Sequence, residues 1–220
     1  MARPSAVADE RPATTTTTTT TREAGDRLIA AGRALMQDRR STDFTMQAVA
    51  ERARTSLRTV YEQFASRDDF LLAVFRQAIA ESAEPLRAAV ARAGDGPARL
   101  RAYVEQLFDA TFAEEHPEMP ALVALHMDLA RTNPSALAGV LAPQQEILVD
   151  VLRGGVADGS FRDDVDVTAL AMLVSLTVIG ALHSTALGTH FGSEVDAERV
   201  VRFCLGAVAR PDGDRVGRAH

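Results

Sequence analysis

The chain lacks several residues that define common classes of protein. Its 220 residues include no Trp, one Cys and no Lys, so all 24 basic side chains are Arg. A single Cys excludes a disulfide scaffold and any zinc site built on several cysteines. No basic segment leading into an apolar stretch opens the chain, so no secretory signal is visible. We therefore expect a cytoplasmic protein.

Recognisable catalytic machinery is also missing. The sequence contains no Gly-rich phosphate-binding loop and no nucleophile elbow. Its five histidines lack the spacing of metal ligands; they are His116, His126, His183, His190 and His220. These absences predict that the protein is not an enzyme and uses no metal and no cofactor.

The negative net charge of −6 is unevenly distributed. Residues 1–76 contain 12 Arg against 10 acidic residues, whereas residues 77–220 contain 12 Arg against 20. A basic front part hints at nucleic-acid binding there, although a random scatter of charges is an alternative. The hydrophobic content of 46% is sufficient for a core, which excludes global disorder.

Both ends of the chain lack an apolar period. Residues 1–21 contain eight consecutive threonines, which have no apolar face to bury and so do not offset the entropy of ordering. Residues 210–220 are rich in Asp, Gly and Arg. We expect disordered tails at both ends. Contact of the first tail's arginines with DNA phosphates is an alternative role.

Between the tails, apolar residues recur at helical spacing, without strand-like alternation or hairpin turns. The sequence therefore predicts an all-α fold of about nine helices with no internal repeat. Pro85 is expected to kink or end the fourth helix, and Pro143 to interrupt the seventh. The expected helices cover residues 22–38, 46–53, 57–64, 67–85, 97–112, 119–131, 134–157, 167–187 and 194–208.

Residues 167–193 contain no Asp, Glu, Lys or Arg and are numerous enough to cross a bilayer. Polar side chains within the stretch, aspartates before it and the lack of an aromatic belt argue against a membrane span. A helix that is apolar nearly all round must still be buried. We predict burial by its own domain on one side and by a second copy of the chain on the other. The expected interface residues are Leu173, Leu176, Gly180, Ser184, Val201 and Leu205.

The segment from Thr45 to Asp69 has the pattern of a helix-turn-helix. Small alanines allow two short helices to cross closely, with Val49 facing Val60 and Phe64. The second helix presents hydroxyl, guanidinium and amide groups, which suit phosphates and base edges. Acidic residues are sparse on this face.

This segment resembles the tetracycline-repressor (TetR) family of transcriptional regulators. The resemblance extends from Arg22 to Phe75, and the rest of the chain is similar only in length, helix number and a terminal pair of apolar helices. It implies a helix-turn-helix DNA-binding domain over 22–66 and a ligand-binding and dimerisation domain over 67–209. The matching residues are Ala50-Glu51-Arg52-Ala53, Ser56, Arg58-Thr59-Val60-Tyr61, Phe64 and Ser66-Arg67.

The resemblance also implies a role for each DNA-binding residue. Arg58 would read guanine as a bidentate donor, and Arg67, where the family usually has Lys, would hold a phosphate. An alternative is that Thr59 and Tyr61 only pack the three-helix unit. The implied contacts are Thr45, Ser56, Thr59, Tyr61 and Arg67 on the backbone, and Leu57, Arg58 and Gln63 in the major groove.

The segment departs from the family pattern at the turn between its two helices. Arg54 stands where the family usually has Gly, and a left-handed Arg costs roughly 1 kcal/mol. Leu57 stands at a usually basic position, which favours thymine methyl contact over guanine. These departures affect the expected operator sequence rather than the binding mode.

In the second domain the resemblance implies an apolar ligand cavity between helices. His126 would supply a polar contact there, although a core or surface role is an alternative, and the Met and Phe positions also fit ordinary core packing. The candidate lining residues are Phe108, Phe112, Met119, Leu122, His126, Met127 and Met172.

Together with the helix-turn-helix pattern, the resemblance implies a homodimeric repressor of a palindromic, double-stranded DNA operator. Binding of a small, largely apolar effector would release the operator. An activator and a ligand-binding protein that has lost operator binding are alternatives. No membrane partner is expected.

Overall fold

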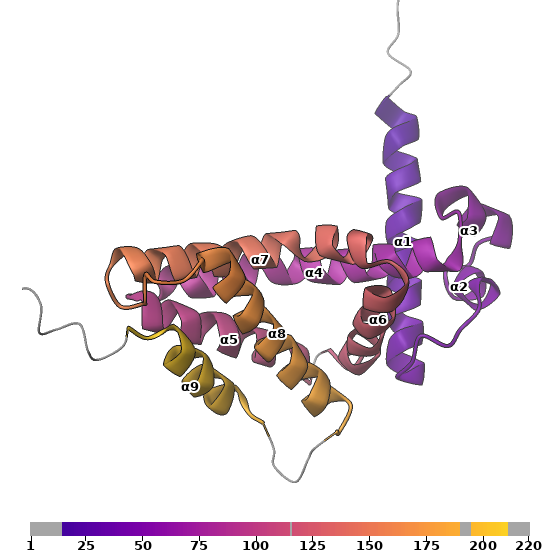
Figure 1. The fold of residues 1–220 in the computed structure, drawn as a ribbon. Helices are drawn as coiled ribbons and strands as arrows, with labels where there is room; N and C mark the ends of the chain where they lie inside the picture. Colours follow the sequence, from indigo (N-terminus) through magenta and orange to yellow (C-terminus); the bar gives the residue numbers. More distant parts are fainter. Residues whose placement is uncertain (1–14, 115, 190–194, 211–220) are drawn as a thin grey trace, which may run out of the picture.

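The computed structural model describes residues 15–114, 116–189 and 195–210. This part of the chain forms nine helices without a strand, which confirms the all-α prediction (Figure 1). One isolated bridge joins Phe161 to Ala209. The helices are α1 (Thr15–Arg39), α2 (Met46–Arg52), α3 (Leu57–Gln63), α4 (Arg67–Arg92), α5 (Gly96–Phe112), α6 (Met119–Thr132), α7 (Pro134–Ala157), α8 (Val167–Ala186) and α9 (Ala197–Val208).

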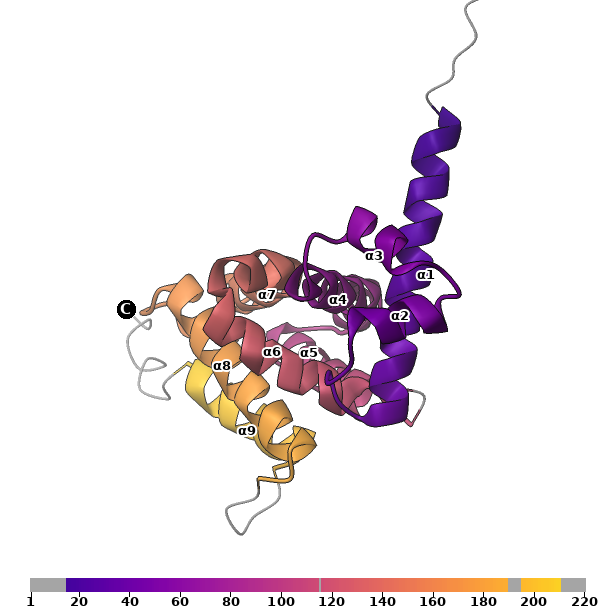
Figure 2. The same cartoon turned by 90° about the vertical axis from the view of Figure 1, so that its right-hand side faces the viewer.

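Two hydrophobic cores organise the helices, and α4 enters both. Its first half contributes Phe70 and Val74 to a core shared with α1, α2, α3, α6 and the start of α7. Its second half contributes Leu86 to a core shared with α5, α7, α8 and α9. Figures 1 and 2 show α4 running from the α1–α3 group into the bundle. A displacement of α4 would therefore change the packing of both cores.

Side-chain caps start most of the helices. Thr45, Ser56 and Ser66 each accept a hydrogen bond from the backbone N–H three residues on, and Asp166 accepts one from Thr168. Each such cap contributes about 1 kcal/mol. Asp95, Asn133 and Asp196 cap α5, α7 and α9 in the same way.

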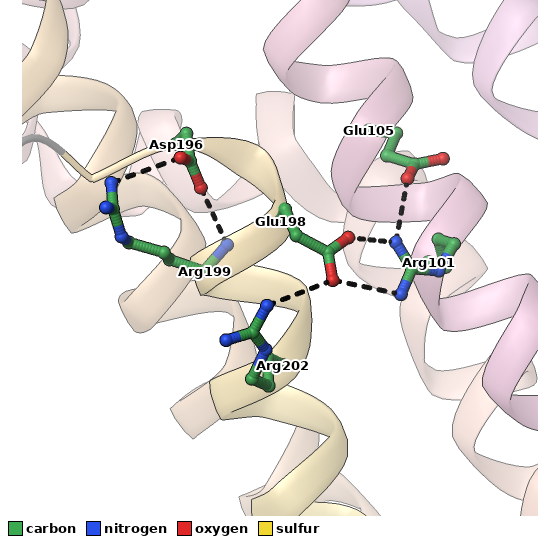
Figure 3. Close-up of polar contacts among 6 residues, drawn as sticks. All are labelled: Arg101, Glu105, Asp196, Glu198, Arg199 and Arg202. Atoms are coloured by element: carbon green, nitrogen blue, oxygen red, sulfur yellow. Dashed lines mark hydrogen bonds and ion pairs between the residues drawn. The ribbon is translucent and has the colours of Figure 1, made fainter.

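An ion-pair network on the surface links α9 to α5. Arg101 of α5 donates hydrogen bonds to Glu105 on its own helix and to Glu198 of α9 (Figure 3). Arg202 lies 3.6 Å from Glu198 on the other side. Because these pairs are exposed, they fix the position of α9 more than they stabilise the fold.

The structure corrects three expected boundaries. Helix α1 begins at Thr15 rather than residue 22, because a nucleated helix propagates at one hydrogen bond per ordered residue. Helices α4 and α7 continue through Pro85 and Pro143, since apolar residues on both sides of each proline are buried and outweigh one lost hydrogen bond. The tail predictions for residues 1–14 and 211–220 lie outside the described residues.

Candidate nucleic-acid interface and ligand cavity

The turn between α2 and α3 is closed by a pair of backbone hydrogen bonds. Arg54 N–H donates to Glu51 O at 3.1 Å, and Thr55 N–H donates to Ala50 O at 2.9 Å. This is the Schellman arrangement, which requires a left-handed residue after the helix. Arg54 supplies it with a φ of +54°. The turn therefore keeps its shape without glycine.

Replacing Arg54 with Gly should stabilise the chain by about 1 kcal/mol. The side chain of Arg54 is exposed and its backbone is in the conformation that glycine adopts without strain. Urea unfolding of Arg54→Gly measures the gain. Arg52→Gly, inside α2, is the matched control and should destabilise by about 1 kcal/mol. A loss of stability in Arg54→Gly would contradict the strain argument.

Helix α3 exposes the side chains that suit DNA. The Arg58 side chain is 88% exposed and Tyr61 is 51% exposed, while Val60 on the opposite side is fully buried. Ser56 is exposed, and Leu57, Thr59 and Gln63 are half-buried at the edges of this face. Thr45 is exposed at the start of α2. The helix thus presents a polar ridge to solvent.

Two arginines of the DNA-binding domain have partners that the sequence did not predict. Arg58 Nε donates to Glu62 at 2.8 Å in an exposed pair on the same helix. Arg67 is half-buried and donates to the backbone carbonyls of Phe44, at 3.2 Å, and Thr42. Arg67 therefore ties the α1–α2 loop to the first turn of α4. Arg67 thus has a positioning role, and its phosphate contact stays a prediction.

A cavity of about 460 Å³ lies among α4, α5, α6, α7 and α8, with one contact from α1. Three of the predicted ligand residues, Met119, Leu122 and His126, lie on its wall. The wall is mainly apolar, and it includes Phe75, Ile79, Leu107, Leu141, Ile179 and Leu182. Its size and lining are those of a small-molecule site.

The other four predicted ligand residues lie elsewhere. Phe108 is buried and Phe112 is exposed, and both line a separate depression beside the start of α9. Met127 and Met172 are about half exposed, at 48% and 54%. Successive residues of a helix point about 100° apart, so His126 facing the cavity turns Met127 away from it. The prediction that these four residues line the ligand cavity is therefore wrong.

Two histidines meet at the cavity wall. His126 Nδ1 and His183 Nε2 are 2.8 Å apart, which joins α6 to α8, and the His126 ring stacks on Phe75 of α4. Burial, with a smaller contribution from His183, lowers the pKa of His126 to about 4. Burial also lowers the pKa of His183. Both rings are therefore neutral at pH 7, and the pair always offers one N–H donor and one acceptor nitrogen.

The histidine pair should make the protein less stable in mild acid. The unfolded chain binds protons near pH 6.5, whereas folded His126 resists protonation until about pH 4, so stability is present above pH 6.5 and is lost as the pH falls toward 4. Allowing for partial exposure, we expect His126 to contribute a loss of about 1 kcal/mol between pH 7 and pH 5. Urea unfolding at the two pH values tests this. His126→Gln should lose less on acidification than the wild type, and an equal loss would contradict the assignment.

An ion-pair cluster at the cavity edge joins α1 to α4 and to the start of α6. Arg33 donates to Glu81 at 2.5 Å and to Glu118 at 2.7 Å. Glu118 is 6% exposed, which makes it one of the few buried charged residues. No local pattern in the sequence indicates this cluster, because Arg33 lies 48 residues from Glu81 and 85 residues from Glu118.

The expected dimer surface is partly present. Leu173 and Leu176 of α8 are 62% and 59% exposed, and Phe203 of α9 is 66% exposed. Gly180 is exposed, and Ser184 is half-buried and donates to Thr189 O. Val201 is corrected: it is fully buried in the core, because α9 turns it inward with Cys204, and Leu205 packs partly on the same core.

Helix α8 is long and apolar enough to cross a membrane by length and composition alone. One of its faces nevertheless belongs to the second core through Leu170, Val174 and Val178, while the other is exposed. This division is typical of a helix with a core side and an interface side.

Comparison with known proteins agrees with the geometry. Residues 28–74 match the family model of the bacterial regulatory proteins, tetR family. The fatty acid degradation regulator FadR from Bacillus halodurans is 18% identical, with a TM-score of 0.68 over 83% of this chain and 98% of that one. FadR from Bacillus subtilis, solved with stearoyl-CoA, is 14% identical, with a TM-score of 0.68 over 84% and 97%. RolR, solved with resorcinol, is 18% identical, with a TM-score of 0.66 over 87% and 90%. No curated protein matches the chain.

Proposed function

We propose that the chain, whose residues 28–74 match the family model of the bacterial regulatory proteins, tetR family, is a cytoplasmic, homodimeric repressor that a small molecule releases from its DNA operator. The observation that carries the proposal is α3. It follows a tight left-handed turn, buries Val60 and leaves Arg58 and Tyr61 exposed. A short helix held in this way can enter a major groove.

In the proposed complex, each side chain predicted to bind DNA on this surface makes one kind of contact. Ser56, Thr59 and Tyr61 contact phosphates, and Thr45 does the same from the start of α2. Leu57, Arg58 and Gln63 reach base edges, where Arg58 pairs with guanine and Leu57 touches a thymine methyl group. Specificity therefore depends on three side chains of one helix.

Dimerisation supplies the second recognition helix. The exposed apolar side chains Met172, Leu173 and Leu176 of α8 and Phe203 of α9 form a surface that a second copy would cover. A two-fold dimer of this kind reads a palindrome whose half-sites lie about 34 Å apart.

In this proposal the effector occupies the cavity, whose wall includes residues of α4, the helix that follows α3. Met119, Leu122 and the His126–His183 pair would contact the ligand, together with Phe75 of α4. Since α4 enters both cores, a ligand that favours one position of α4 changes the spacing of the two α3 helices. Its effect is limited to its difference in affinity for the two states. Proteins of this fold solved with stearoyl-CoA and resorcinol support a small-molecule effector.

Binding to the DNA upstream of its own gene tests the proposal. The wild-type chain should bind that DNA with sequence selectivity and with an affinity that falls as salt rises. Arg58→Ala and Tyr61→Ala should each weaken binding about tenfold, by losing one base or phosphate contact. Gel shifts at fixed salt measure the effect.

The matched control is Arg153→Ala, which removes an equally charged, exposed side chain on α7, and its affinity should equal that of the wild type. A second candidate function is a ligand-binding protein without operator binding, which the Arg58–Glu62 pair favours because it neutralises the reading residue. That function requires Arg58→Ala and Tyr61→Ala to leave any DNA affinity unchanged. A reporter gene downstream of the site distinguishes repression from activation.

A further inference from the structure

The charged side chains around the cavity are mostly carboxylates. The wall includes Glu81 and Asp109, and Glu118 lies directly behind Arg33. Among the described residues of the wall, Arg33 is the one guanidinium, and it already donates to both glutamates. Three carboxylates at or behind the wall are thus matched by one guanidinium, which is shared between Glu81 and Glu118.

The histidines of the wall do not reverse this balance. His126 and His183 are held neutral by burial, which lowers the pKa of each. His116 lies 3.9 Å from Glu118, and a proton on it would offset only one of the two surplus carboxylates. The cavity therefore keeps a negative surplus in either protonation state of His116.

Glu81 is both ionised and within reach of a ligand. Burial raises the pKa of its carboxyl, but hydrogen bonds from Gln77 and Arg33 outweigh burial, so the net shift is downward. Its side chain is 48% exposed, so its partners do not enclose it. Asp109 adds a second exposed carboxylate from α5. The rest of the wall is mainly apolar and includes Ile79, Leu122 and Ile179.

From this arrangement we infer that the effector of the proposed regulator is a lipophilic amine, which places its cation at Glu81 and Asp109 and its apolar body on the wall of α4, α6 and α8. A carboxylate or phosphate of the same shape would meet the negative surplus and find no unshared cation on the described wall. That the amine acts as an effector rests on the proposed function. The preference of the cavity for an amine does not depend on it.

Three probes of matched shape test the preference: 2-naphthylmethylamine, 2-naphthylmethanol and 2-naphthoate. The chain has no Trp, so naphthyl fluorescence anisotropy is read with little protein background. At pH 7.5 the amine should bind about tenfold more tightly than the carboxylate, with the alcohol between them. A ratio near one, a preference for the carboxylate or binding of none of the three would overturn the inference.

Two variants locate the preference. Glu81→Gln and Asp109→Asn should each lower the ratio of amine to carboxylate affinity about fivefold. Asp109 is exposed, so its variant remains informative if loss of the Arg33–Glu81 pair disturbs folding. Glu84→Gln is the control, because this residue lies on α4, is 81% exposed and is outside the cavity wall. An unchanged ratio in both cavity variants would contradict the site.

Binding of upstream DNA by the same preparations separates the two proposals. DNA binding without amine preference refutes the ligand class alone, whereas amine preference without DNA binding refutes the regulator alone.

Discussion

Arg33→Met should destabilise the chain by about 3 kcal/mol. The substitution keeps an unbranched apolar stem but leaves Glu118, which is 6% exposed, without the guanidinium that lies 2.7 Å from it. A buried charge deprived of its partner costs about 3–5 kcal/mol, and the partial exposure of Arg33 places this case at the lower end. Urea unfolding at pH 7, followed by circular dichroism, measures the loss.

The reason for this loss can be checked by restoring neutrality. In Arg33→Met with Glu118→Gln, the uncompensated charge is gone, so more than half of the lost stability should return. Arg87→Met removes an exposed pair with Glu84 and should cost less than about 0.5 kcal/mol. Equal losses of stability in Arg33→Met and Arg87→Met would contradict the claim that buried Glu118 depends on Arg33.

Gly32→Ala should destabilise the chain by about 2–3 kcal/mol through the contact between α1 and α4. A Cβ at Gly32 would lie 2.5 Å from Cζ of Phe70, whose side chain is fully buried. Phe44 and Phe64 pack edge-on against that ring, so it cannot move aside freely. Overpacking of this kind forces the backbones apart. Thermal unfolding detects the loss.

Gly25→Ala on the same helix is the matched control. A Cβ there would lie 3.6 Å from Gln63 Oε1, which is an ordinary contact. The substitution should be neutral or stabilise α1 by up to about 1 kcal/mol through helix propensity. Equal losses in the two alanine variants would show that α1 responds to any substitution rather than to the clash with Phe70.

The elements that the sequence predicted well are those set by local chemistry. Thr45, Ser56 and Ser66 cap their helices by bonding the N–H three residues on, a rule that needs no tertiary information. The cost at Arg54 was predictable in the same way, because the turn demands a left-handed residue. The predicted interruptions at Pro85 of α4 and Pro143 of α7 were wrong, because packing of the adjacent turns decides whether a helix continues through a proline.

The ligand cavity was only partly predictable, since it depends on which face each helix turns inward. Leu122 and His126 share a face of α6 and were assigned together correctly to one wall, whereas Met127 was assigned by its apolar character and points outward. Arg33 could not be found, because its partners come from distant parts of the chain. Long-range ion pairs leave no local pattern.

A footprint of the chain on the DNA upstream of its gene tests whether α3 reads an operator. We expect protection of two inverted half-sites whose centres lie about one helical turn apart, and we expect Arg58→Ala with Tyr61→Ala to lose this protection at the same protein and salt concentrations. Absence of a footprint, or protection that the double variant retains, would contradict the claim that α3 reads an operator.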